Sequence, residues 1–180
     1  MIAKEENHAT NGGGVYVNGG DVTVTGGNIE YNTAQNGGGV YLDNSTMTLH
    51  DGKISGNHAD QGGGIYMGGT NTLIMENGSI TNNEASWGGA IAYSGGNNTA
   101  DLRGGSITGN TAKSNGGAIQ VDFTNVEVCA VTIKNSTFRN NSADGEGGAI
   151  GADLMTVNPA GGLMISPTMD ASNILVFAVT

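Results

Sequence analysis

The sequence predicts an all-β solenoid, a fold in which short strands stack coil upon coil, and three observations support this prediction. The tripeptide Asn-x-Ala recurs six times, at intervals of 25, 25, 26, 27 and 31 residues. A glycine pair or triplet and then Val or Ile follow each copy within a few positions. Apolar residues in between alternate with a period of two, which is typical of strands and not of helices. One supersecondary unit is therefore repeated. Its asparagines are Asn7, Asn32, Asn57, Asn83, Asn110 and Asn141.

The first strand of each unit leads into this asparagine with an apolar residue three positions before it. In a stacked structure these apolar residues form one inward ladder, and the asparagines form another. An Asn amide can donate a hydrogen bond to the next copy and accept one from the copy before. We also expect the asparagines to form turns, because Asn tolerates the left-handed backbone conformation. The apolar ladder consists of Ile29, Ile54, Ile80, Ile107 and Phe138.

The second strand follows the glycines, as in Val15-Tyr16-Val17, and the third alternates clearly in Val22-Thr23-Val24 and Met47-Thr48-Leu49. Three short strands in a unit of this length leave room only for short turns. This favours a coil of a parallel β-helix over an array of hairpins. We therefore expect a right-handed parallel β-helix of about six coils with three short strands per coil, its handedness following from the general crossover preference.

The repeat also predicts how the chain is organised. Residues 1–155 are expected to form the coils, and beyond Leu154 the pattern fails. Residues 156–180 are expected to be a C-terminal cap or a truncated further coil. Because the first repeat begins close to the first residue, we expect the chain to be a segment of a longer, exported protein.

Charge and composition exclude several partners. Six Lys and Arg against sixteen Asp and Glu give a net charge of −10, so we expect no nucleic acid or anionic membrane surface as a partner. No run approaches the ~18 apolar residues of a membrane span. The lone Cys129 excludes an internal disulfide. We expect no metal and no cofactor, because pairs such as Asp122 and Asp153 offer too few oxygens for calcium.

The repeats resemble the right-handed parallel β-helix repeats of bacterial surface and adhesin-like proteins, typified by GGGVY…G…I-x-G-N-x-A, from about Asn7 to Ala152. Three copies of Gly-Gly-Ala-Ile and the segment Phe138-Arg139-Asn140-Asn141 are also similar to tetrapeptides of polymorphic outer-membrane autotransporter proteins. Only one of the five aligned copies carries the Phe. The resemblance implies extracellular or cell-surface display and adhesion to carbohydrate or to a host surface protein.

Candidate ligand-binding residues are the outward tyrosines of the second strand, Tyr16, Tyr41 and Tyr66, which successive coils bring into one row. Aromatic faces bind the apolar faces of sugars, and the hydroxyl of Tyr stays solvated. Tyr93 and Trp87 are candidates to extend this row. The alternative is that the tyrosines only stabilise the sheet through cross-strand pairing.

Two other functions stay open beside a non-enzymatic binding segment. A polysaccharide lyase or glycoside hydrolase would use the outward column that contains His50, Glu76 and Arg103. Alternating charges on neighbouring strands are more often solvated ion pairs. The third alternative is a purely structural spacer that associates end to end through its open coils.

Overall fold

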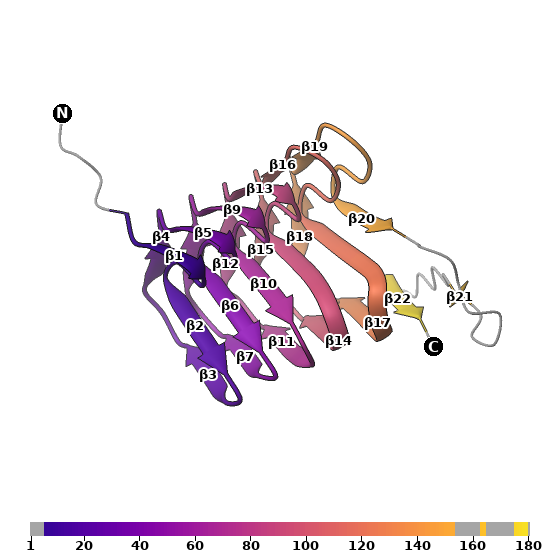
Figure 1. Cartoon of the computed structure of the whole chain (residues 1–180), viewed down its shortest axis with the longest axis horizontal. Coiled ribbons are helices and arrows are strands. Elements are labelled where there is room, and N and C mark those ends of the chain that lie inside the picture. Colours follow the sequence, from indigo (N-terminus) through magenta and orange to yellow (C-terminus); the bar gives the residue numbers. More distant parts are fainter. Residues whose placement is uncertain (1–5, 154–162, 165–174, 180) are drawn as a thin grey trace.

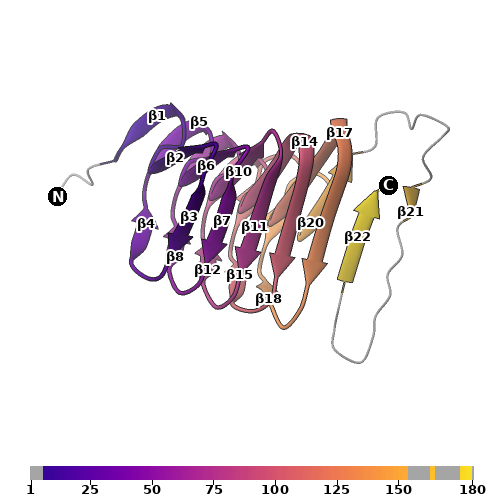
Figure 2. The same ribbon diagram turned by 90° about the horizontal axis from the view of Figure 1, so that it is seen from below.

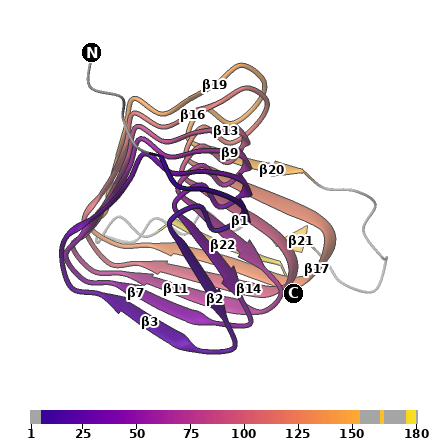
Figure 3. The ribbon, with the colours of Figure 1, turned by 60° about the vertical axis from the view of Figure 1, so that its left-hand side comes forward.

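The structure is a rod of stacked β-coils (Figure 1). The computed structural model describes residues 6–153, 163–164 and 175–179, and these contain strands and turns but no helix. Equivalent residues of successive repeats pair in parallel and in register. Thr33, for example, pairs with His8 of the coil before and His58 of the coil after. The views along the side and toward the end of the rod show the same stacking (Figures 2 and 3).

The Asn-x-Ala tripeptide begins a strand in every repeat, and these strands form a six-stranded sheet, here called the alanine sheet. Its alanines point inward: Ala34, Ala59, Ala85 and Ala112 are buried. The sheet consists of β1 (His8–Asn11), β5 (Thr33–Asn36), β9 (His58–Gln61), β13 (Glu84–Trp87), β16 (Thr111–Ala112) and β19 (Ser142–Ala143).

The predicted apolar ladder lies in a second sheet, the isoleucine sheet. Ile54, Ile80 and Ile107 are fully buried, and Ile29 and Phe138 are partly buried at the two ends of the ladder. Five strands form this sheet: β4 (Asn28–Glu30), β8 (Lys53–Ser55), β12 (Ser79–Thr81), β15 (Ser106–Thr108) and β18 (Thr137–Arg139).

The third sheet, the large sheet, contains both of the remaining strand columns. They are separate in the first three repeats and fuse in the long strands β14 (Ile91–Leu102) and β17 (Ile119–Ile133). Figure 3 shows both columns as two sides of the rod, with the alanine sheet above them. The other strands are β2 (Val15–Asn18), β6 (Val40–Asp43), β10 (Ile65–Gly68) and β20 (Ile150–Asp153) in one column, and β3 (Asp21–Val24), β7 (Thr46–Leu49) and β11 (Asn71–Met75) in the other.

The predicted fold class is confirmed, and the coil is divided more finely than expected. Three parallel sheets are present, but the predicted first strand is split in two at the residue before the ladder asparagine. That residue has a positive φ in the five repeats from Asn32 to Asn141, and none of the ladder asparagines does, so the expected left-handed position was wrong by one residue. Complete coils number slightly fewer than six, because the isoleucine sheet has one strand less than the alanine sheet. The left-handed residues are Tyr31, Gly56, Asn82, Gly109 and Asn140.

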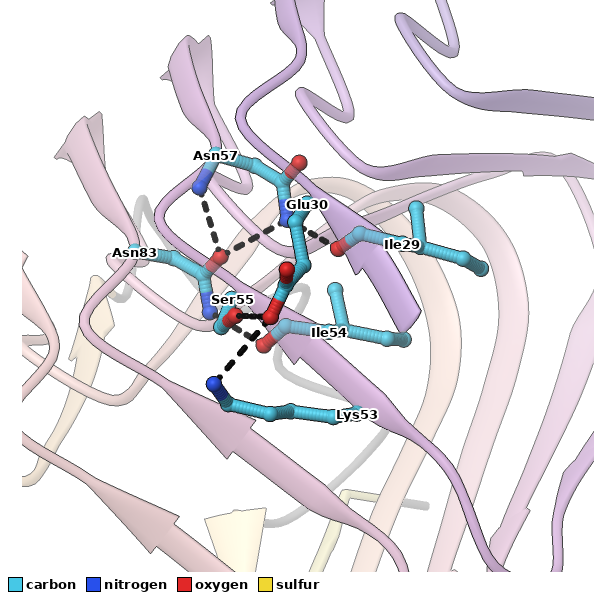
Figure 4. Close-up of polar contacts among 7 residues, drawn as sticks. All are labelled: Ile29, Glu30, Lys53, Ile54, Ser55, Asn57 and Asn83. Carbon is cyan, nitrogen blue, oxygen red and sulfur yellow. Dashed lines mark hydrogen bonds and ion pairs between the residues drawn. The ribbon is translucent and has the colours of Figure 1, made fainter. Parts of the chain in front are cut away.

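The asparagine ladder is confirmed as a continuous hydrogen-bond network. The side chain of Asn57 donates to Asn83 Oδ1 at 3.0 Å and to the Ile29 carbonyl at 3.0 Å (Figure 4). Its own Oδ1 accepts from the side chain and the backbone N–H of Asn32 at 3.0 and 2.9 Å. All hydrogen-bonding positions of this buried amide are therefore used, which removes the cost of burying it.

The glycine turn between the alanine sheet and the large sheet forms a tight corner. The first glycine of each triplet has a positive φ, as Gly12 does at 62°. The second, such as Gly38, lies where an added Cβ would come within 2.6 Å of the Gly63 carbonyl oxygen of the next coil. Glycine is required here because both the backbone conformation and the close approach of coils exclude a side chain.

The C-terminal region departs from the parallel pattern. The strand β22 (Leu175–Val179) pairs antiparallel with β17 and with β21 (Leu163–Met164). Residues 154–162, 165–174 and 180 lie outside the described residues, so the division at residue 155 and the nature of the segment after it stay predictions.

Candidate functional site

The outward tyrosines of the large sheet form a stack of three rings, here called the tyrosine row. In-register pairing of β2, β6 and β10 brings Tyr16, Tyr41 and Tyr66 side by side. Ring centroids are 5.2 Å apart in both pairs, with interplanar angles of 21° and 24°. Because the rings stack on one another, both faces of Tyr41 are covered by its neighbours. The open surface of the row consists of ring edges, hydroxyl groups and the outer face of Tyr16.

Exposure falls steadily along the tyrosine row. Tyr16 is 51% exposed, Tyr41 is intermediate and Tyr66 is 9% exposed. Burial, and then the neighbouring Tyr66, Asp43 and Tyr16, raise the pKa of Tyr41 above its ordinary value. Ala92 and Gln120 take the next two positions of the row and are both 3% exposed. A ligand therefore has access to the N-terminal part of the row.

Polar side chains lie directly beside the accessible tyrosines. Asn18 and Asp43 occupy neighbouring positions two residues after Tyr16 and Tyr41, on the same face of their strands. The Asn18 amide donates to the Tyr16 hydroxyl at 3.4 Å. The next residue in this column is Gly68, where an added Cβ would come within 2.7 Å of the Tyr41 hydroxyl. The hydroxyl of Tyr41 thus extends over a position that has no side chain.

Tyr93 does not extend the row. It pairs with Met67 and not with Tyr66, and it is 1% exposed within the hydrophobic core. The physical reason is the alternation of the strand: Ala92 has the outward position, so Tyr93 points inward. Trp87, the other candidate for extension, is 43% exposed, but it lies at the end of β13 in the alanine sheet, beside Gln61.

The charged column is divided between His50, which contacts two carboxylates, and a separate ion pair of Arg103. His50 Nε2 lies 3.4 Å from Glu76 Oε2, while its Nδ1 lies 2.8 Å from Asp51 Oδ2. Arg103 does not pair with Glu76; its Nε lies 2.8 Å from Asp101 Oδ2. The side chains of His50 and Arg103 are about half exposed. Such pairs are screened by solvent and are typical of a solvated surface.

Metal-binding geometry is not found among the side chains that the structure describes. No group of three His, Cys, Asp or Glu residues in this part of the chain could hold a metal ion. Asp122 pairs in register with Asp153 along the backbone. His8 and His58 lie in the same column with Thr33 between them.

Two further amide networks were not identified from the sequence. At the turn within the large sheet, Asn71 donates to Asn98 Oδ1 at 2.9 Å, and both are buried. At the end of the alanine sheet, Asn36 donates to Asn11 Oδ1 at 3.0 Å. The signal was present in the spacing: each of these pairs is separated by about one repeat, as the ladder asparagines are.

A comparison with protein families agrees with this geometry. Residues 5–157 match the family described as a right-handed β-helix region. The chain belongs to this right-handed β-helix family. The match covers most of the chain and confirms the handedness expected for its coils. No curated protein and no solved structure matches this β-helix chain significantly. None of the described residues forms a helix long and apolar enough to cross a membrane.

Proposed function

We propose that this β-helix segment is a non-enzymatic binding element of a surface or secreted adhesin-like protein, and that the tyrosine row binds carbohydrate. The observation that carries the proposal is the register of Tyr16 and Tyr41, whose rings stack at 5.2 Å beside the polar groups of Asn18 and Asp43. Sugar recognition combines an apolar contact with hydrogen bonds to hydroxyl groups, and Tyr supplies both.

The arrangement favours binding over catalysis. Glycoside hydrolysis uses two carboxyl groups that flank one scissile bond. The candidate catalytic column itself contains one carboxylate, Glu76, and the neighbouring carboxylates of Asp51 and Asp101 are paired with His50 and Arg103. The residues that repeat in every coil serve the scaffold, as the asparagine ladder shows. The formation of the scaffold does not explain why tyrosines are exposed in the N-terminal part of the tyrosine row.

The test is binding of the purified chain and of a Tyr16→Ala variant to a glycan array. We expect binding by the parent chain and its loss in the variant, because Tyr16 is the terminal and most exposed ring of the row. The matched control is Tyr31→Asn, which removes an exposed tyrosine outside the row. Asn accepts the left-handed conformation that Tyr31 has at φ 58°. Equal binding by parent and Tyr16→Ala, or no binding to any glycan, would overturn the proposal.

A further inference from the structure

We infer that the ligand of the tyrosine row is a linear, neutral glycan that lies along the rod axis. A second row of side chains, here called the amide row, would bind the hydroxyl groups of this glycan. The inference rests on the function proposed above and extends it to a class of ligand and a direction of binding. The amide row consists of Asn11, Asn36, Gln61 and Trp87, which pair in register at the end of the alanine sheet.

The amide row and the tyrosine row lie on the two sides of the glycine corner. Gly12 directly follows Asn11, and a Cβ added to it would lie 3.0 Å from the Tyr16 Cα. The same contact recurs in the third coil, where a Cβ added to Gly62 would lie 3.0 Å from the Tyr66 Cα. The corner therefore lies close to the backbone of the tyrosine row, and the glycine itself adds no side chain there. Figure 3 shows this turn of the chain from the alanine sheet back onto the large sheet.

Donor groups in the amide row are available to a ligand. Neither the Gln61 amide nor the Trp87 indole N–H makes a hydrogen bond within the described part of the chain, and Trp87 is 43% exposed. Asn36 uses one of its two donors for Asn11. Amides offer both donors and acceptors, which suits sugar hydroxyl groups, and the indole ring adds an apolar surface.

The stacking of coils sets the direction of the ligand. Each coil contributes one residue to each row, and neighbouring coils are ~4.8 Å apart. The sugar rings of an extended glycan follow one another at a similar step, so a chain parallel to the rod can present successive rings to successive coils. A glycan that crosses the rod would leave both rows after one ring.

Charge selects against acidic sugars. Asp43 lies beside the tyrosine row, two residues after Tyr41 in the same strand, and it contributes to the raised pKa of Tyr41. The basic side chains that the structure describes lie elsewhere. Three of them are paired with acidic residues outside the two rows: Lys53, Arg103 and Lys113. Of the remaining two, Lys134 directly follows β17 and Arg139 is the last residue of β18. An acidic sugar would therefore meet a carboxylate with no counterion in these rows.

The experiment measures the affinity of the chain for neutral gluco- and manno-oligosaccharides of one to six sugars and for oligogalacturonides of the same lengths. We expect affinity for the neutral series to rise with length up to about four sugars, one for each coil of the amide row. Gln61→Ala should lower it about 3- to 10-fold, as expected for the loss of one or two hydrogen bonds. The matched control is Asp60→Ala, which changes an exposed residue of the same strand outside the row. Asp43→Asn should raise the affinity for the acidic series.

The outcomes separate this inference from the proposed function. If Tyr16→Ala abolishes binding while Gln61→Ala behaves as Asp60→Ala does and affinity is independent of length, the amide row and the direction of binding are refuted. The proposed function then stands. Tight binding of oligogalacturonides by the parent chain would refute the neutral ligand. If Tyr16→Ala has no effect on any glycan, the proposed function itself fails.

Discussion

Replacing one buried asparagine of the ladder with alanine should destabilise the rod far more than the same replacement at the end of the ladder. The side chain of Asn83 takes part in four hydrogen bonds of 3.0 Å: its amide donates to Asn110 Oδ1 and to the Ile54 carbonyl, and its Oδ1 accepts from the side chain and the backbone N–H of Asn57. At ~1 kcal/mol each, Asn83→Ala should lower the free energy of unfolding by about 4 kcal/mol. Much of this comes from the backbone N–H of Asn57, which would be left buried without an acceptor.

Asn7 is the matched control, because it is exposed and its side chain makes one hydrogen bond of the ladder, to Asn32 Oδ1. We expect Asn7→Ala to cost about 1 kcal/mol or less. The assay is urea unfolding followed by far-UV circular dichroism and by the fluorescence of Trp87, the single tryptophan, which lies in the same coil as Asn83. Two similar free energies of unfolding for the two variants would show that the ladder does not stabilise the stacking of coils.

Two other predictions concern the tyrosine row and the glycine corner. The pKa of Tyr41 is raised in the folded state, so the neutral side chain is favoured by folding. This contribution to the free energy of unfolding is fully present at pH values below the ordinary pKa of 10.0. This contribution is lost as the pH rises through the higher pKa of the folded protein. Titration of tyrosinate absorbance should show a late step that Tyr41→Phe removes, and a Tyr41→Phe variant that keeps this step would refute the assignment. Gly63→Ala should lower the free energy of unfolding by about 1–3 kcal/mol, because its Cβ would meet two backbone oxygens at 2.5 Å. Gly20→Ala, with no atom within 4 Å of its Cβ, should be nearly neutral in the same unfolding assay, and equal losses in the two variants would contradict the steric argument.

The fold could be predicted because its periodic contacts are made between copies of the same residue. Asn57 bonds to Asn83, and Ile54 pairs with Ile80, so the contact is visible as a repetition in the sequence. The left-handed position before each ladder asparagine could not be read in this way. Its column alternates between glycine and larger residues, as at Gly56 and Asn82, and only the φ angles show what its members share.

The candidate site could be predicted only in part: the direction in which a side chain points was accessible from the sequence, but its exposure was not. The inward position of Tyr93 was accessible from the sequence, because the alternation that places Tyr66 outward also places Ala92 outward and Tyr93 inward. The fall in exposure from Tyr16 to Tyr66 was not accessible. Tyr16 lies in the first coil, whereas Tyr66 lies between Tyr41 and Ala92 of the two neighbouring coils, and its burial is seen only in the folded structure.

Repetition and ligand binding make opposite demands on a column of this rod. In a column of identical residues, each side chain can bond to its own copies, and the buried asparagines use all of their hydrogen-bonding groups in this way. Such a column has nothing left for a ligand. The tyrosine row is intermediate: its rings stack on each other, but its ring edges and the outer face of Tyr16 are not used. The amide row is the least regular of the three, and its later members, Gln61 and Trp87, keep their donors free within the described part of the chain. Binding capacity should therefore be greatest where a column stops matching its own copies, at the edge shared by the tyrosine row and the amide row.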